Sequence, residues 1–271
     1  MLEPRARMSR GPLRAARVAG ALVRTSLATA LQYRTDFVLD GVTGLVRAVA
    51  TLAPLWLVFA QRDQIVGWTE PQVTLVAGLF FLMQGLIAGL IEPNLGEIVE
   101  AIRNGNLDLM LLKPADAQLL ASVRRIAPGR LWDVAVAAAL LAWALPSIDP
   151  APLDVVVAGV LLMAGCGAMY GLWVLAICTS FWLVRVDNLR FLLWAATDAG
   201  RFPLDVFTRW VRFGLVVVVP VGLLTTLPVV ALRGDWTAGL VGAAVLVAAG
   251  FVVGSRVAWT TALASYTSAS S

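Results

Sequence analysis

The sequence predicts an all-α polytopic membrane protein with six transmembrane helices, and three observations lead to this prediction. Hydrophobic residues make up 59% of the 271 residues and charged residues only 14%, whereas a soluble domain of this size would carry about 25% charged residues. The mean hydropathy is +0.83. Several apolar segments approach or exceed the roughly 20 residues that a helix needs to cross the hydrocarbon core. They are unbroken, whereas the strands of an outer-membrane barrel alternate in segments of about ten residues.

Residues 1–36 are expected to form an amphipathic helix on the membrane surface. Four arginines share one narrow helical face, and apolar residues occupy the rest; the four are Arg10, Arg14, Arg17 and Arg24. Such a helix lies in the headgroup plane with its arginines towards anionic lipid. A disordered basic tail is the alternative. No cleavable signal peptide is evident, because no small-residue cleavage site follows a short apolar run.

The six spans are expected between residues 37 and 260, and residues 261–271 form a C-terminal tail. The expected bounds are about 37–60, 72–91, 131–145, 153–183, 213–232 and 237–259. Gly85 and Gly89 give the second span a small-residue face for close helix packing. Pro220 and Pro228 should break the fifth span into shorter pieces, which a membrane tolerates where protein or water meets the freed carbonyls.

The placement of arginines predicts the orientation. With the N-terminus in the cytoplasm, only Arg62 and Arg233 fall on the outer side. Both termini then face the cytoplasm, as do the two sizeable polar connections, residues 92–127 and 184–212. The outer loops are short, so we expect a multi-pass protein of the plasma membrane without an external domain.

Asp40 and Arg47 lie two turns apart on one side of the first span. Ionisable groups at membrane depth are costly and usually face protein or water. They could line a translocation path or form structural pairs with neighbouring helices. The structural alternative is slightly favoured, because Asp40 lies near the inner headgroups.

The connection after the second span carries the most distinctive polar stretch. Asn94 is expected to cap a short helix in which Glu97 completes a capping box, and Gly105 is expected to end it in a left-handed conformation. The candidate contact residues along this stretch are Glu97, Glu100, Arg103, Asn104, Gly105 and Asp108. A short, charged and capped helix in a membrane protein indicates a contact with a soluble partner. A solvated loop helix is the alternative.

Several kinds of chemistry are excluded. The chain has no histidine, so imidazole-based catalysis and imidazole metal sites are absent. Cys166 and Cys178 are expected to lie about 18 Å apart along one helix, too far for a disulfide. Lys113 is the only lysine and Pro114 follows it, so no GxxxxGK[ST] phosphate loop exists. We therefore expect no catalytic residue, metal or cofactor site in this chain, and any energy for pumping must come from another polypeptide at the inner face.

The string IRNGNLDLMLLKP at residues 102–114 resembles the R-x-G-x-L-D-x-x-L-x-x-P signature of the ABC-2 type transporter permeases. It is most similar to the six-helix branch of ABC-2 family or viologen-exporter-like permeases. The prolines at 203, 220 and 228 resemble that branch more weakly. The likeness covers residues 94–126 and 187–230 in motifs, and the whole chain in hydropathy.

This resemblance implies a transmembrane subunit that dimerises, with itself or with a related permease. It also implies cytoplasmic ATP-binding-cassette subunits that hold ATP and Mg²⁺, and no nucleic-acid partner. The connection between spans two and three would supply the coupling helix, with Arg103 and Asp108 as the best contact candidates because they match the motif. Most such systems export drugs, lipids or other amphipathic molecules, along a path lined by the first, second and fifth spans.

Two other classes of function stay open. A membrane-embedded enzyme acting on lipids would need an acid, base or metal cluster, and only Asp187, Asp198 and Asp205 are spaced acids in the second connection. Without histidine or cysteine beside them they look solvated. A passive scaffold or assembly factor is the third class. A neighbouring ATP-binding-cassette reading frame would argue against both.

Overall fold

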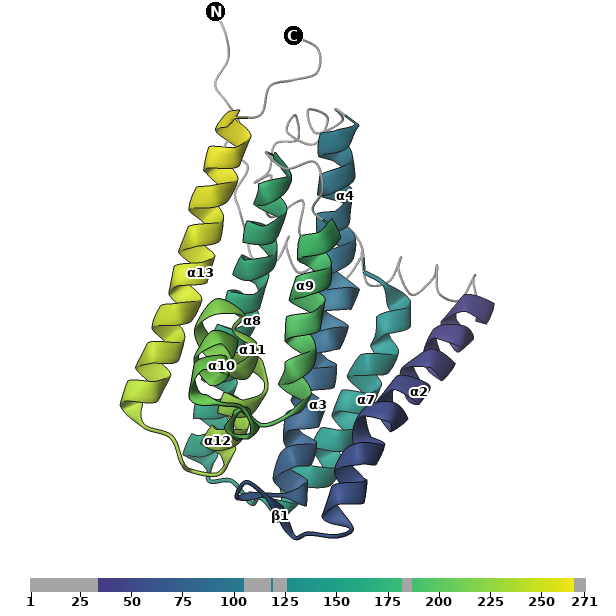
Figure 1. Cartoon of the computed structure of the whole chain (residues 1–271), viewed down its shortest axis with the longest axis vertical. Coiled ribbons are helices and arrows are strands. Elements are labelled where there is room, and N and C mark those ends of the chain that lie inside the picture. Colours follow the sequence, from purple (N-terminus) through teal and green to yellow (C-terminus); the bar gives the residue numbers. More distant parts are fainter. Residues whose placement is uncertain (1–33, 105–117, 119–125, 182–186, 266–271) are drawn as a thin grey trace, which may run out of the picture.

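The computed structural model describes residues 34–104, 118, 126–181 and 187–265. The chain forms a bundle of long helices with one small hairpin (Figure 1). The α-helices and strands are α2 (Arg34–Phe59), β1 (Gln64–Ile65), β2 (Trp68–Thr69), α3 (Glu70–Leu86), α4 (Glu92–Arg103), α7 (Leu131–Ala144), α8 (Pro152–Cys178), α9 (Asp187–Thr197), α10 (Arg209–Phe213), α11 (Val221–Leu224), α12 (Thr226–Leu232) and α13 (Ala238–Ser265). Two π-helical segments are η1 (Ile87–Ile91) and η7 (Gly214–Val218). Short 3₁₀ segments are η2 (Pro128–Arg130), η3 (Leu145–Ser147), η4 (Thr179–Phe181), η5 (Asp198–Arg201) and η6 (Leu204–Val206).

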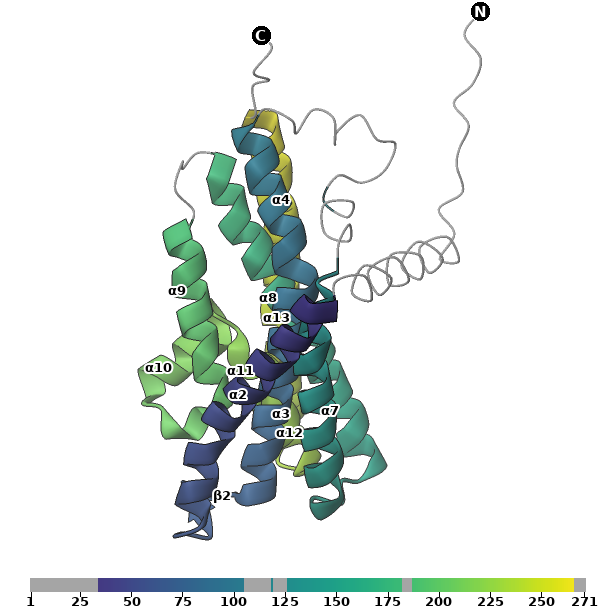
Figure 2. The ribbon, with the colours of Figure 1, turned by 90° about the vertical axis from the view of Figure 1, so that its right-hand side faces the viewer.

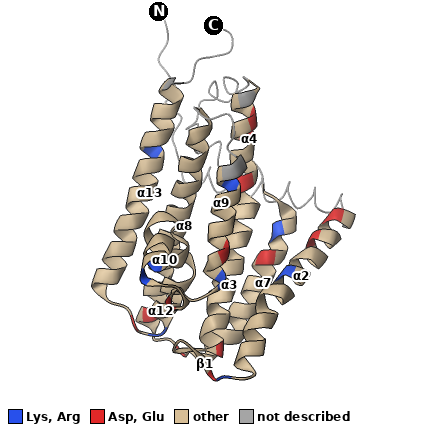
Figure 3. Ribbon diagram, in the orientation of Figure 1, with Lys and Arg blue, Asp and Glu red and all other residues tan. Residues whose placement is uncertain are grey.

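The long helices confirm an all-α polytopic membrane protein. Five helical runs are long and apolar enough to cross a membrane, namely Thr35–Phe59, Glu70–Ile102, Pro128–Ser147, Pro152–Phe181 and Ala238–Ala264. A sixth is counted if the bent pair Arg209–Val218 and Val221–Leu232 forms one span. Charged residues are sparse along these helices (Figure 3): α8 contains only Asp154 and α13 only Arg256.

The second span lies at the centre of the bundle. In its most apolar window 78% of the residues are buried, against 17% in α13. α2 and α13 lie at opposite edges in Figure 1, and Figure 2 shows α9 and α10 on the side away from α7. α4 and the last turns of α8 and α13 form one end of the bundle, here named the α4 end; β1 and β2 lie at the other, the hairpin end (Figure 1).

The hairpin leads the chain directly into the second span. Val66 and Gly67 at its tip both have positive φ, 50° and 80°, as a two-residue type I′ turn requires. Trp68 after the turn is 2% exposed. The backbone N–H of Thr69 then donates to the side chain of Gln72 at 3.1 Å, which starts α3.

The second span does not end near residue 91 as expected. The helix continues from Glu70 to Ile102, and its 33 residues extend about 50 Å at about 1.5 Å per residue, well beyond the hydrocarbon core of about 30 Å. The predicted N-cap at Asn94 is therefore wrong. Asn94 is 1% exposed inside the helix, and its side-chain amide donates to the carbonyl of Leu90 at 2.5 Å.

Residues 187–212 do not form the connection expected at a single end of the bundle. Arg190 contacts Glu92, Asp198 contacts Gln84, and the indole of Trp68 donates to Asp205 at 2.9 Å. These pairings place α9 antiparallel to the second span and carry the chain to the hairpin end. The charges are tolerated because partners neutralise them, as in the ion pair of Arg212 and Asp205 at 2.9 Å. The prediction of a wholly cytoplasmic connection is corrected accordingly.

The expected fifth span is a bent pair of helices. Arg209–Val218 and Val221–Leu232 meet at 77°, and Pro220 lies at the bend. Pro228 is the third residue of α12, and the helix is interrupted just before it at Thr225 (φ −110°, ψ −64°), so each of the two prolines lies next to a break, as expected. First-turn N–H groups have no intrahelical partner in any case, which is why proline is accepted there.

Candidate functional site

The exposed end of α4 carries the predicted polar residues. Leu95 and Ile98 are 1% and 0% exposed and pack in the core cluster that contains Trp173 of α8. Glu97 is half-buried, whereas Glu100 and Asn104, one turn apart, are exposed. The side chain of Arg103, and Gly105 and Asp108 altogether, lie outside the described residues. α4 thus buries one face against α8 and presents Glu100 and Asn104 at its tip.

The helix passes Pro93 through the π-helical turn η1. Pro93 has no N–H, so it cannot bond the carbonyl of Gly89 four residues earlier. That carbonyl instead accepts from the backbone N–H of Ala127 at 2.9 Å. The N–H of Glu92 bonds the carbonyl of Ile87, five residues back. The hydrogen bond between Gly89 and Ala127 therefore links the middle of the second helical run to the residues that lead into the third span.

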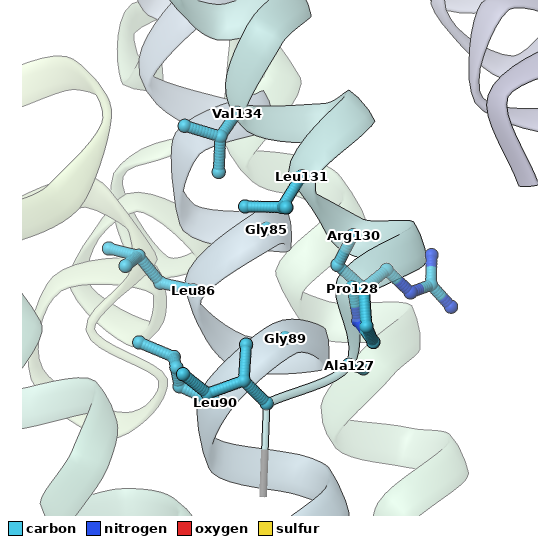
Figure 4. Close-up of a pocket in the computed structure, with 10 residues that line it drawn as sticks. Gly85, Leu86, Gly89, Leu90, Ala127, Pro128, Arg130, Leu131 and Val134 are labelled. Atoms are coloured by element: carbon cyan, nitrogen blue, oxygen red, sulfur yellow. The ribbon is translucent and has the colours of Figure 1, made fainter. Parts of the chain in front are cut away.

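Small residues on η1 and α3 admit the start of the third span. A Cβ atom on Gly85 would lie 2.8 Å from Val134 Cγ2, and one on Gly89 would lie 3.3 Å from Arg130 Cβ, both closer than ordinary contacts. An apolar pocket of about 240 Å³ follows this surface beside Leu86 (Figure 4). The predicted small-residue face is thus a real packing surface, and it lies beside the Gly89–Ala127 hydrogen bond.

Glu92 ties the second span to α9. Its carboxylate accepts from the guanidinium of Arg190 at 2.5 Å and from the indole N–H of Trp194 at 3.3 Å. On the other side of η1, the Gln84 amide donates to Asp198 at 3.4 Å. Sequence reasoning missed Glu92, although an acid immediately before a proline at the end of an apolar run was a usable signal.

Asp40 and Arg47 do not pair with each other. Arg47 bonds Asp133 of α7 at 3.3 Å, and Asp133 also contacts Arg130 at 3.5 Å. Asp133 is 1% exposed and was not singled out from the sequence. Asp40 packs closely on Gly129, where any side chain would collide with its carboxylate. These contacts link α2 to α7 and support the structural alternative for Arg47.

Gln118 lies between two further helices. Its side-chain amide donates to the hydroxyl of Tyr170 in α8 at 3.3 Å and accepts from Arg256 in α13 at 3.1 Å. The connection 92–127 therefore contacts α8 and α13 through Gln118, in addition to its backbone bond at Gly89.

The described residues contain no group of three or more His, Cys, Asp or Glu that could hold a metal ion. The acids considered for a lipid-modifying enzyme are engaged elsewhere: Asp198 with Gln84, and Asp205 with Trp68 and Arg212. The side chain of Asp187 lies outside the described residues. The arrangement offers a mechanical linkage between helices and no evident acid–base centre in this part of the chain.

The fold and this linkage define a multi-pass helical membrane protein whose central helical run of 33 residues is longer than a span requires. The family model for ABC-2 family transporter proteins matches residues 45–270. The chain therefore belongs to the ABC-2 transporter family, whose members are membrane components of transporters that work with ABC ATP-binding subunits. No curated protein matched the chain, and no solved structure did.

Proposed function

We propose that this chain is the permease subunit of an ATP-binding-cassette exporter. It would move a drug-like, lipid or other amphipathic molecule out of the cytoplasm, with ATP and Mg²⁺ bound to partner subunits. The observation that carries the proposal is the single helical run Glu70–Ile102. Its middle is buried in the bundle, and its tip carries the exposed Glu100 and Asn104.

The second span acts in this proposal as a rod that the ATPase moves at one end. α3 packs on α7, and Glu92 connects the rod to α9 through Arg190. The bond between Gly89 and Ala127 makes the start of the third span follow the rod as well. A displacement at the tip of α4 is thus distributed to three neighbouring elements, and the spans respond by rigid-body rocking.

The ATPase contact in this proposal comprises Glu97, Glu100, Arg103, Asn104, Gly105 and Asp108. The α4 end is cytoplasmic, as are both termini, and two permease copies or two related permeases form the translocation path from their first, second and fifth spans. The orientation still rests on the arginines of residues 1–36 and 92–127, although Arg212 joins Arg62 and Arg233 at the hairpin end.

Affinity purification of the tagged chain in mild detergent tests the proposal. An ATPase subunit should co-purify in near-stoichiometric amount, and nucleotide hydrolysis should follow that subunit, with none in the verified single chain. Hydrolysis by the isolated chain would overturn the permease assignment.

Variants then test the contact itself. Gly105→Val should cost about 1 kcal/mol or more if the site needs positive φ, and the pair Arg103→Glu/Asp108→Lys reverses two charges. We expect both variants, and Glu100→Lys, to insert and dimerise normally while losing ATPase retention or transport-coupled turnover. Asp63→Lys reverses an exposed acid at the hairpin end and serves as the matched control. Full transport with normal ATPase retention in all three variants would show that the stretch is only a solvated loop.

A further inference from the structure

A pocket of about 330 Å³ opens at the hairpin end, where α2, α3 and α7 come together, and the proposed coupling does not use it. Its lining consists of Trp56, Glu70, Thr74, Leu140 and Trp143. Trp56 lies in the last turn of α2, Glu70 is the first residue of α3, and Trp143 lies in the last turn of α7. Three separate helix ends therefore contribute one carboxylate, one hydroxyl and two indoles to a single cavity.

Glu70 differs from the other acids that the described helices shelter from solvent. Glu92, Asp133, Asp154 and Asp205 are buried or half-buried, and each has an ion-pair or hydrogen-bond partner. Glu70 is half-buried too, yet no ion pair or side-chain hydrogen bond joins it to another residue in the part of the chain that the structure describes. Glu70 lies in the first turn of α3, where the helix N-terminus favours a carboxylate, so the pocket carries a negative charge that no cation among the described residues neutralises.

The two indoles are the second feature of the pocket that favours a bound cation. Trp56 is 47% exposed and Trp143 57% exposed, so neither ring is fully packed in the core and both remain accessible to a ligand. Indole faces attract ammonium groups through the ring quadrupole, and tryptophan is the strongest of the aromatic side chains in this respect. An interfacial position explains exposed tryptophans and a helix N-terminus explains an acid, but neither explains why both line one pocket.

We propose that this pocket binds an alkylammonium group, supplied by the headgroup of a phospholipid at the membrane surface. The pocket lies at helix ends, and the neighbouring Leu57 and Val58 on α2 are 64% and 41% exposed, as lipid-facing residues are. A headgroup with an anionic phosphate and no ammonium would be repelled by Glu70, and a neutral group would leave its charge unpaired. The ammonium approaches Glu70, the indole faces flank it, and the acyl chains follow the apolar surface of α2.

Native mass spectrometry of the full chain tests the proposal with two lipids of the same acyl chains. Phosphatidylethanolamine carries an ammonium group, and phosphatidylglycerol does not. We expect Glu70→Gln to weaken phosphatidylethanolamine binding about tenfold and Trp143→Leu to weaken it several-fold, while neither change weakens phosphatidylglycerol binding. Asp63→Asn removes another acid at this end and Trp210→Leu an exposed indole elsewhere; both controls should stay within twofold of the parent chain.

A second measurement on the unaltered chain does not depend on any variant folding. Choline is titrated against its uncharged isostere 3,3-dimethylbutan-1-ol, with tryptophan fluorescence as the readout. Binding of choline alone, without a lipid preference, would keep the ammonium site and identify a free organic cation as its source. Equal binding of choline and the isostere, or a lipid preference that survives Glu70→Gln, would overturn the proposal.

Discussion

Breaking the contact between Glu92 and Arg190 should destabilise the protein and uncouple α9 from the second span. The two groups lie 2.5 Å apart, and their side chains are 24% and 34% exposed. Exposed ion pairs contribute about 0.2–1 kcal/mol, whereas breaking a fully buried pair costs about 3–5 kcal/mol. The intermediate burial of this pair leads us to expect a coupling free energy of about 1.5–2.5 kcal/mol.

A double-mutant cycle of Glu92→Gln and Arg190→Met measures this coupling free energy in detergent. About 1 kcal/mol corresponds to a shift of about 2–4 °C in Tm for a chain of this size, so each single variant should lower Tm by about 4–8 °C. The double variant should lower it little further, because the interaction is already lost.

The ion pair of Arg233 and Asp235 provides the control cycle, since its side chains are also close, 2.9 Å apart, but Asp235 is 56% exposed. Its coupling should stay below about 1 kcal/mol. Additive effects at Glu92 and Arg190, with a coupling below about 0.5 kcal/mol, would refute the view that this contact joins the second span to α9.

Three further predictions concern packing and topology. Asp133→Asn should cost about 3 kcal/mol in thermal unfolding, because it leaves two arginines facing a neutral amide. Gly171→Val should cost about 2–3 kcal/mol or prevent folding, because a Cβ there would lie 2.6 Å from the backbone of Phe251. Gly242→Ala is the control: a Cβ at Gly242 would have no atom within 4 Å, so this change should be neutral or slightly stabilising. On a background without the native cysteines, an impermeant thiol reagent should label a cysteine at Ser147 in intact cells and leave one at Asn104 unlabelled; labelling at Asn104 would overturn the orientation.

The spans that could be predicted from the sequence are those whose apolar runs have no competing signal. Hydropathy alone locates α2, α7, α8 and α13, whose bounds in the structure lie close to the expected ones. The end of the second span could not be found in this way. Pro93 predicts a break by local rules, but the carbonyl it frees at Gly89 is satisfied by Ala127, 38 positions further along the chain. Only the folded chain contains that partner.

The course of residues 187–212 was missed for a similar reason. Its arginines and aspartates favoured a solvated connection, because local composition does not show that Asp205 meets Trp68, 137 positions away. Among the candidate contact residues, Glu100 and Asn104 are exposed and Glu97 is half-buried. The roles of Glu92 and Asp133 could not be predicted from the sequence, because each pairs with an arginine on another helix.

The hydrogen bond between Ala127 and Gly89 joins the two ends of the segment 90–126. Both partners are backbone groups, so this junction depends on a proline four residues after the acceptor and hardly on the side chains between them. Within the segment, Leu95 and Ile98 are fixed by the core, whereas Glu100 and Asn104 are exposed. The surface at the tip of α4 can therefore change while the junction and the packed face of the helix stay the same.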